Sequence, residues 1–242
     1  MSDSISRRRF CFVTAAALLG TAVASSAPAT TPTQVPTLLD HILLGCNDLD
    51  RGIAFVEQHT GVRATFGGVH PGRGTQNALL SLGERRYLEI IAPDPKQPGV
   101  SSRGGDLRSL TDPRLVGWAA HPAAIGNTAK RLADAAIPHS GPTAGSRRKP
   151  DGTTLHWATI DLADDRAGLL PFFIQWSPDS RHPSLDAPQG CRLTQFTVSV
   201  PDSDKLAAFF QSIDLDVAVE PAERPYLSAH ITGPGGILRL SS

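Results

Sequence analysis

The sequence predicts an α+β fold in which repeated β-α-β-β-β units pair into a curved mixed sheet, with a central cleft and the helices outside. Three observations lead to this prediction. Apolar residues make up 40% of the 242 residues, and 22 glycines and 20 prolines divide them into short runs, as turns between strands do. A strand-like run followed by a helical pattern begins at residues 39, 116 and 193. One such unit is too small to bury both faces of its sheet, so neighbouring units must pair.

The first unit is predicted over about residues 38–95. It starts with a strand over residues 39–44, and apolar residues then recur at helical spacing over residues 49–56. Asp48 is a good N-cap for this helix, and Gly61 is a good C-terminal stop. Short apolar runs predict the three remaining strands, over residues 64–69, 77–82 and 86–91.

The second unit is predicted over about residues 113–180 and the third over about residues 190–242. The second unit repeats the order strand, helix, strand, strand, at residues 116–120, 124–136, 153–161 and 170–176. The third starts with a strand over residues 193–198, and Asp202 opens a helix whose apolar spacing repeats that of the first unit. Its last strands are predicted over residues 226–231 and 236–240. We therefore expect one composite domain over residues 38–242.

The first 24 residues have the pattern of an export signal. Three arginines precede a short, weakly apolar run that ends in small residues. The run is too short and too rich in alanine to span a bilayer stably. The segment Ser6-Arg7-Arg8-Arg9-Phe10 resembles the twin-arginine export signal of bacteria. We therefore expect cleavage after Ala24, a flexible leader over residues 25–37, and a periplasmic or extracellular protein whose export partner is the twin-arginine machinery.

Charge and motifs exclude several functional classes. The chain has 23 basic and 23 acidic residues; cleavage of the signal would remove three Arg and one Asp, which leaves a net charge of −2. A nucleic-acid partner is not expected, because such proteins need a basic face. No stable membrane insertion of the mature chain is expected either. The sequence also lacks a phosphate-binding Gly-Lys-Ser/Thr loop, a dinucleotide fingerprint after a strand and a nucleophile elbow, which argues against kinases and serine hydrolases.

Two cysteines remain after the expected cleavage, Cys46 and Cys191. An oxidising compartment permits a disulfide between them. The alternative is a pair of buried thiols, because the sequence does not show whether the two residues lie close enough to pair.

The first unit also carries a family resemblance. A β-α-β-β-β unit with a histidine on its first strand and a glutamate on its last resembles the vicinal oxygen chelate superfamily, which includes glyoxalase I, extradiol dioxygenases and bleomycin-resistance proteins. Within that superfamily the sequence is similar to the glyoxalase-like domain proteins, over most of the chain from about residue 38. The segments that carry the resemblance are Leu39-Asp40-His41-Ile42-Leu43-Leu44-Gly45, Gly67-Gly68-Val69-His70-Pro71-Gly72-Arg73-Gly74-Thr75-Gln76-Asn77, Tyr87-Leu88-Glu89-Ile90-Ile91-Ala92-Pro93-Asp94, Leu169-Leu170-Pro171-Phe172-Phe173-Ile174-Gln175-Trp176, His182-Pro183 and Gly190-Cys191-Arg192-Leu193.

His41 and Glu89 are the candidate catalytic and metal-binding residues. Both have apolar neighbours on their strands, where an ionised glutamate is costly to bury unless it is paired or bound to a metal. Imidazole and carboxylate together suit a divalent ion such as Zn, Fe, Mn or Ni. The resemblance implies that the ion acts as a Lewis acid on two neighbouring substrate oxygens. Two alternatives stay open: Glu89 is a base that moves a proton next to a carbonyl, or the two residues bond to each other in a metal-free cleft.

The other two units depart from the superfamily pattern at the positions that would complete a ligand set. Positions matching His41 and Glu89 hold Trp118 and either Ile174 or Gln175 in the second unit, and Gln195 and Arg239 in the third. Of these, Gln195 is predicted to be a weak oxygen ligand or a substrate contact.

Further substrate-binding residues are predicted beside the metal pair. His70 and Arg73 lie in a glycine-rich loop that can close over an acid or a carbonyl compound. Asn77 enters the following strand, and His156 lies on a strand of the second unit, with a core histidine as its alternative. The run Arg147-Arg148-Lys149 is interpreted as a solvated turn, or as a guide for an anionic ligand.

These predictions lead to one functional hypothesis and one rival. The hypothesis is an exported, metal-dependent lyase, isomerase or dioxygenase that acts on a small oxygen-bearing compound. The rival is a metal-free protein of the same fold that binds or sequesters a small molecule. The second and third units lack the His and Glu residues that would complete a metal site, and this absence favours the metal-free binding protein.

Overall fold

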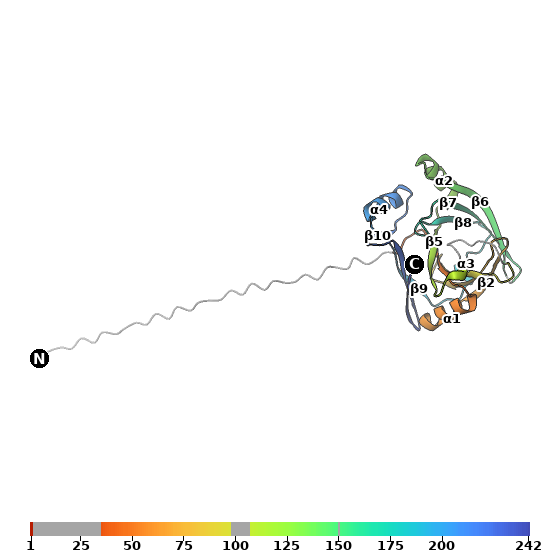
Figure 1. The fold of residues 1–242 in the computed structure, drawn as a ribbon, viewed down its shortest axis with the longest axis horizontal. Helices are drawn as coiled ribbons and strands as arrows, with labels where there is room; N and C mark the ends of the chain where they lie inside the picture. The colour runs from red at the N-terminus through yellow and green to blue at the C-terminus, as the bar shows by residue number, and fades with distance from the viewer. Residues whose placement is uncertain (2–34, 98–106, 150) are drawn as a thin grey trace. The chain divides into compact units, whose positions relative to one another are not determined.

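A computed structural model describes Met1 and residues 35–97, 107–149 and 151–242. The predicted export signal over residues 1–24, and nearly all of the leader, lie outside the described residues. From residue 35 onward the described chain belongs to one compact unit. Three successive segments of this unit each run strand, helix, strand, strand, strand (Figure 1). Among the described residues, no helix is long and apolar enough to cross a membrane.

The first segment builds half of a curved eight-stranded sheet. Its elements are β1 (Leu39–Gly45), α1 (Leu49–Thr60), β2 (Thr65–His70), β3 (Thr75–Ser81) and β4 (Tyr87–Pro93). The strands lie in the order β2-β3-β4-β1, and β4 runs parallel to β1. Asp48 accepts a hydrogen bond from the backbone N–H of Arg51, and Gly61 ends the helix in the left-handed conformation at φ 75°. Both predicted ends of α1 are therefore confirmed.

The second segment builds the other half of the sheet. Its elements are β5 (Arg114–Ala120), α2 (Ile125–Asp134), β6 (His139–Arg148), β7 (Thr154–Leu162) and β8 (Phe172–Trp176). Because β5 pairs antiparallel with β1, the two halves join in the order β2-β3-β4-β1-β5-β8-β7-β6. The edge strands β2 and β6 also contact each other, so the sheet curls back on itself. Two short helices lie outside this repeat, η1 (Leu107–Ser109) and α3 (Pro183–Asp186).

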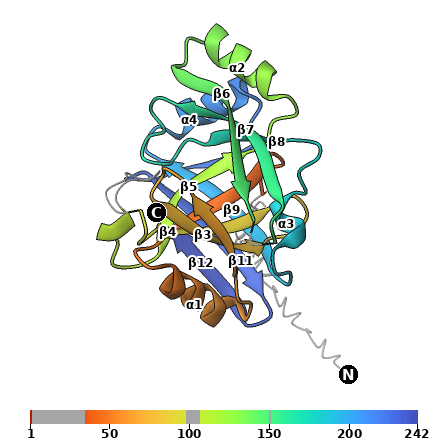
Figure 2. The ribbon, with the colours of Figure 1, turned by 90° about the vertical axis from the view of Figure 1, so that its right-hand side faces the viewer.

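The third segment forms a separate four-stranded sheet. Its elements are β9 (Arg192–Val200), α4 (Ser203–Ser212), β10 (Ala218–Pro221), β11 (Tyr226–Gly233) and β12 (Gly236–Ser241). The strand order is β10-β9-β11-β12, so the first strand of this segment lies between its second and third strands instead of beside its last. Strands β11 and β12 contact α1 of the first segment (Figure 2). The α+β class with a curved mixed sheet is confirmed.

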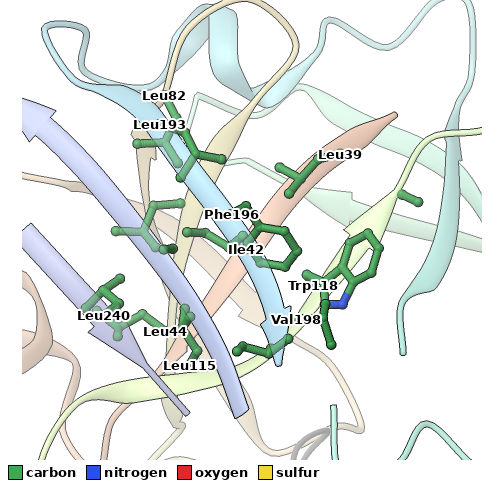
Figure 3. Close-up of a cluster of buried hydrophobic side chains, with 14 of the residues drawn as sticks. Leu39, Ile42, Leu44, Leu82, Leu115, Trp118, Leu193, Phe196, Val198 and Leu240 are labelled. Carbon is green, nitrogen blue, oxygen red and sulfur yellow. The ribbon is translucent and has the colours of Figure 1, made fainter. Parts of the chain in front are cut away.

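The main core fills the space between the two sheets. Ile42 of β1 lies opposite Trp118 of β5 in the sheet register, and both point toward β9 (Figure 3). The ring of Trp118 lies 5.1 Å from that of Phe196 and 6.0 Å from that of Phe210, between ring centres. Its Nε1 donates a hydrogen bond of 3.0 Å to the carbonyl of Leu169. The third segment therefore covers one face of the large sheet, and the cleft belongs to the first two segments.

Strand β6 is the main element that the sequence did not predict. Its sequence, HSGPTAGSRR, contains two glycines and a proline and has no large apolar residue, so it has little intrinsic strand preference. It forms because its backbone pairs with β7 from His139 to Arg148, at an edge of the sheet where such residues are tolerated. The predicted solvated turn is accordingly wrong at Arg147, which lies within β6 and is buried.

Cys46 and Cys191 are free and buried. The structure therefore supports the alternative of two buried thiols over a disulfide. Burial raises the pKa of the Cys46 thiol to about 12, so this side chain stays protonated at neutral pH.

We expect Trp118→Ala to destabilise the fold more than the alanine substitution of any tryptophan that lines the cavity. The substitution removes a fully buried side chain that joins the two sheets, which typically costs about 3–5 kcal/mol of unfolding free energy. Urea denaturation followed by circular dichroism measures this cost. Trp157→Ala, at a partly exposed position, is the matched control and should cost less. Equal losses in the two variants would contradict the central role given to Trp118.

Candidate functional site

The curled sheet encloses a cavity of about 170 Å³ on the face opposite the main core. Strand alternation explains its lining, because His41 and Glu89 point into it while Ile42 and Ile90 point into the core. The other lining residues are Leu43, Tyr87 and Ile91 of β1 and β4, Thr75 and Asn77 of β3, Trp157 and Thr159 of β7, Phe172, Ile174 and Trp176 of β8, and His70, Arg73 and Arg147.

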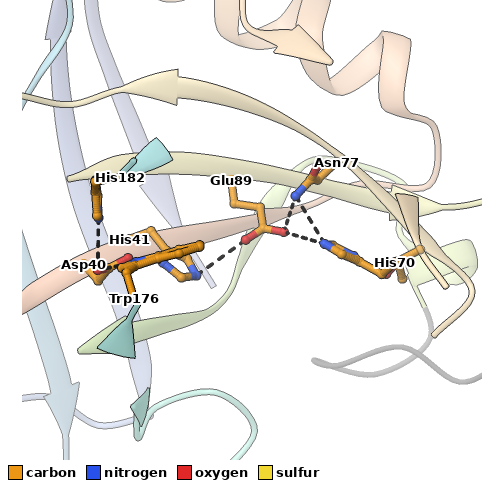
Figure 4. Close-up of polar contacts among 8 residues, drawn as sticks. Asp40, His41, His70, Asn77, Glu89, Trp176 and His182 are labelled. Carbon is orange, nitrogen blue, oxygen red and sulfur yellow. Dashed lines mark hydrogen bonds and ion pairs between the residues drawn. The ribbon is translucent and has the colours of Figure 1, made fainter. Parts of the chain in front are cut away.

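A buried carboxylate fixes the orientation of His41. Asp40 Oδ1 lies 2.7 Å from Nδ1 of His41, and its Oδ2 accepts hydrogen bonds from Trp176 Nε1 at 3.1 Å and from His182 Nε2 at 3.2 Å (Figure 4). Burial alone would raise the pKa of Asp40, but the hydrogen bonds from His182 and His41 outweigh it and hold that pKa well below its usual range. An ionised Asp40 holds a proton on Nδ1 of His41, so Nε2 is the ring nitrogen that faces the cavity.

The ring of His41 is also held by aromatic neighbours. It stacks on Tyr87, with ring centres 4.5 Å apart, and meets Phe172 edge-on at 5.4 Å. Only 1% of the residue is exposed, and Nε2 is buried without a hydrogen-bond partner. A buried ring nitrogen without a hydrogen-bond partner is unusual in proteins and indicates a binding role.

Glu89 is the carboxylate that faces this nitrogen. Its Oε2 lies 3.5 Å from Nε2 of His41, and its Oε1 lies 3.6 Å from Nε2 of His70 (Figure 4). Asn77 donates a hydrogen bond of 2.8 Å to Oε1. Burial would raise the pKa of Glu89, but the neighbouring His70, His41 and Asn77 together lower it below its usual value. The carboxylate is therefore ionised at neutral pH.

His70 presents an unprotonated nitrogen on the other side of Glu89. Its Nδ1 lies 2.8 Å from Oγ1 of Thr75, and its Nε2 lies 3.3 Å from Nδ2 of Asn77, which can only donate. Burial lowers the pKa of His70, so the imidazole is neutral at pH 7. This tautomer follows from the hydrogen-bond network.

The donor chemistry of the site fits a divalent transition metal. Such ions bind carboxylates and unprotonated imidazoles, and metal-bound histidines usually donate their other N–H to a carboxylate, as His41 does to Asp40. Among the residues that the structure describes, however, no group of three or more His, Cys, Asp or Glu side chains is arranged to hold a metal ion. His41 and Glu89 are the pair that could hold one, because Nε2 of His70 already has Asn77 Nδ2 as a donor at 3.3 Å.

Five of the seven predicted site residues line the same cavity: His41, His70, Arg73, Asn77 and Glu89. Two lie elsewhere. His156 is exposed on β7, because the cavity-facing positions of that strand are Trp157 and Thr159. Gln195 lies on β9 in the four-stranded sheet, where its side chain contacts Thr197. The predicted substrate contacts of these two residues are thus corrected.

The second and third units offer no ligands to the cavity at the matched positions. Trp118 points into the core, and Arg239 is exposed on β12. Ile174 lines the cavity but has no donor atom, and Gln175 faces away, where its side chain accepts a hydrogen bond of 2.9 Å from the backbone N–H of Ile125 at the start of α2.

Several residues of the site had no assigned role in the sequence. Asp40 precedes His41 on β1, and strand alternation predicts that their side chains lie on opposite faces of the sheet. The two side chains nevertheless contact each other. The register of β1 against β5 shifts between Leu39 and His41, and this irregularity allows the contact. His182 and Trp176 belong to segments that carry the family resemblance, and only the folded chain brings them to Asp40. Arg147, by contrast, had a predicted role, since its run was interpreted as a solvated turn or as a guide for an anionic ligand.

Comparisons with known proteins agree with the fold. The family model described as glyoxalase-like domain matches residues 39–213. Among solved structures, a hypothetical protein from Staphylococcus aureus aligns with a TM-score of 0.58 at 15% identity, over 84% of each chain, which shows a shared fold.

Two further solved structures are methylmalonyl-CoA epimerases. The enzyme from Streptomyces coelicolor, in complex with 2-nitronate-propionyl-CoA, aligns with a TM-score of 0.42 at 19% identity, over 58% of this chain and 97% of that one. The enzyme from Mycobacterium tuberculosis aligns with a TM-score of 0.41 at 19% identity, over 66% and 97%. A search of curated proteins gives no match.

The buried carboxylates predict how stability depends on pH. The pKa values of Asp40 and Glu89 are lower in the folded chain than the unfolded values of about 3.9 and 4.3, so the unfolded chain binds protons first as the pH falls. The free energy of unfolding should therefore drop below about pH 4.5. Asp40→Asn should flatten this drop and cost about 3–5 kcal/mol at pH 7, because it removes one partner of a buried network.

Urea midpoints measured across pH 3–7 test this expectation. Asp179→Asn, at an exposed position, is the control and should follow the wild-type curve. An Asp40→Asn curve as steep as that of the wild type would mean that Asp40 does not hold its charge in the folded state.

Proposed function

The chain belongs to the glyoxalase-like domain family, and on that premise we propose that it is an exported enzyme that holds a divalent metal ion at His41 and Glu89. Its proposed reaction is that of a lyase, isomerase or dioxygenase on a small oxygen-bearing compound. One observation carries the proposal: the buried, unpartnered Nε2 of His41 faces an ionised carboxylate at 3.5 Å. Ionised carboxylate and unprotonated imidazole are the states in which these groups bind metals.

The residues of the chain divide the work in this proposal. Bound metal would polarise substrate oxygens as a Lewis acid. Asp40 keeps Nε2 of His41 available by holding the proton on Nδ1. Asn77 fixes the carboxylate of Glu89 through its hydrogen bond of 2.8 Å. His70 is neutral and unprotonated at Nε2, so it is the group beside the pair that can take up a proton from the substrate.

A metal-free binding protein is the second candidate. It is favoured by the finding that no group of three or more metal-binding side chains is preformed in the described part of the chain. In this candidate, the charge of Glu89 is balanced by its neighbours alone, and the cavity holds a small molecule against Trp157 and Trp176 without changing it.

Metal analysis of the purified protein separates the two candidates. We expect about one Zn, Fe, Mn or Ni ion per chain, and His41→Ala or Glu89→Gln should each weaken metal affinity by at least tenfold. Because Asp40 orients His41, Asp40→Asn should weaken it by about 10- to 100-fold. His156→Ala is the matched control, since that histidine is exposed outside the cavity, and it should keep the wild-type affinity. Metal content that is absent, or unchanged in both ligand variants, would favour the binding protein.

Export is a separate part of the proposal. It rests on Ser6-Arg7-Arg8-Arg9-Phe10 and on the weakly apolar run after it. Residues 1–37 fused to a folded reporter should carry that reporter to the periplasm of a bacterial host. Replacing both Arg7 and Arg8 by lysine should abolish this export, whereas Arg9→Lys, at the variable position of the pattern, should not. Export that survives the double substitution would exclude the twin-arginine route.

A further inference from the structure

Arg147 is a buried cation at the seam where the curled sheet meets itself. It lies near the end of β6, which contacts β2 across the seam, and only 6% of it is exposed. Two glycines of β2 leave room for its guanidinium: a Cβ atom on Gly67 or Gly68 would lie 3.2 or 2.9 Å from Nη1. The register of β2 against β3 shifts between Phe66 and Gly68, so the strand bulges where the guanidinium lies.

The guanidinium interacts electrostatically with Glu89 of the same cavity, but one of its nitrogens, Nη1, has no bonded partner. Nη1 is shielded from solvent and makes no hydrogen bond, and no carboxylate of a described residue lies within the 4.0 Å of an ion pair with Arg147. Burying an unpaired cation is costly, so such a group normally has an anion close by. Arg147 also lines the cavity of His41 and Glu89, so a ligand bound in that cavity can supply the anion that pairs with Arg147.

The cavity limits the size and shape of this ligand. Its volume of about 170 Å³ is close to that of an engineered cavity of about 150 Å³ that binds benzene. Its walls include the rings of Tyr87, Trp157, Phe172 and Trp176, which present flat apolar surfaces. A planar guanidinium pairs best with a planar carboxylate, through two parallel hydrogen bonds.

We propose that Arg147 is the anion-binding residue of the site and that the substrate class is a small, flat carboxylate. The carboxylate binds the guanidinium of Arg147, the flat body lies between the aromatic walls, and a second oxygen-bearing group reaches His41 and Glu89. This assignment rests on the proposed function for the identity of the reacting end. The assignment of the anion-binding end depends only on the burial and contacts of Arg147. Arg73 at the exposed rim adds a second positive charge to the path of an anion into the cavity.

Benzoate and benzamide test the assignment, because they share a ring and differ in charge. Binding is followed by calorimetry and by the fluorescence of the cavity tryptophans. Benzoate should bind the wild-type protein at least tenfold more tightly than benzamide does. Arg147→Gln should remove this preference, and Arg147→Lys should restore part of it. Arg148→Gln is the matched control, because its side chain is the next on β6 and is exposed, and it should keep the preference.

Equal affinities for benzoate and benzamide in the wild-type protein would overturn the assignment, as would failure of benzoate to bind or an unchanged preference in Arg147→Gln. The wild-type comparison needs no variant and stands even if Arg147→Gln does not fold. Repeating it after chelator treatment and in His41→Ala separates the two proposals. A benzoate preference that persists without metal supports the anion site whatever the metal analysis gives. Metal binding without any benzoate preference supports the proposed function and overturns the anion site.

Discussion

The site depends on one constraint: an ionised and buried carboxylate, Glu89, lies in the wall of the cavity. A buried charge is tolerated only when nearby groups compensate for its lost hydration. Here Asn77 donates a hydrogen bond to the carboxylate, and the charge of Arg147 also lowers the pKa of Glu89. The imidazoles of His41 and His70 lie at 3.5 and 3.6 Å from its two oxygens. Asp40 in turn holds His41, which extends the polar network one layer behind the cavity. These contacts determine which atoms of the cavity remain free to bind.

The architecture makes this constraint possible by dividing two tasks between the faces of one sheet. Strands β1 and β5 send Ile42 and Trp118 to the core and leave the opposite face to the cavity. The third segment covers the core face with its own sheet, so it stabilises the cavity without lining it. In the register of the sheet, β5 places Gly117 and Ala119 opposite Leu43 and His41.

Much of the fold could be predicted because its periodicities are local. The caps of α1 and the alternation of β1 and β4 follow from neighbouring residues, and the cavity-facing positions of His41 and Glu89 follow with them. The topology of the third segment and strand β6 could not be predicted, since both depend on which distant strands pair. The predicted roles of His156 and Gln195 failed for the same reason: residue type suggested a ligand, but strand phase and sheet membership decide which face each residue occupies. His182 reaches Asp40 across 142 positions, and no local signal gives such a contact.

We propose above that His41 and Glu89 jointly bind a divalent metal ion. Anomalous diffraction from crystals grown with Mn²⁺ tests it most directly, because the anomalous signal locates the ion independently of activity. We expect a peak bonded to Nε2 of His41 and to the carboxylate of Glu89, with Asp40 still hydrogen-bonded to Nδ1 of His41. Crystals that show no peak at this pair, while His41 and Glu89 keep their mutual separation of 3.5 Å, would contradict it.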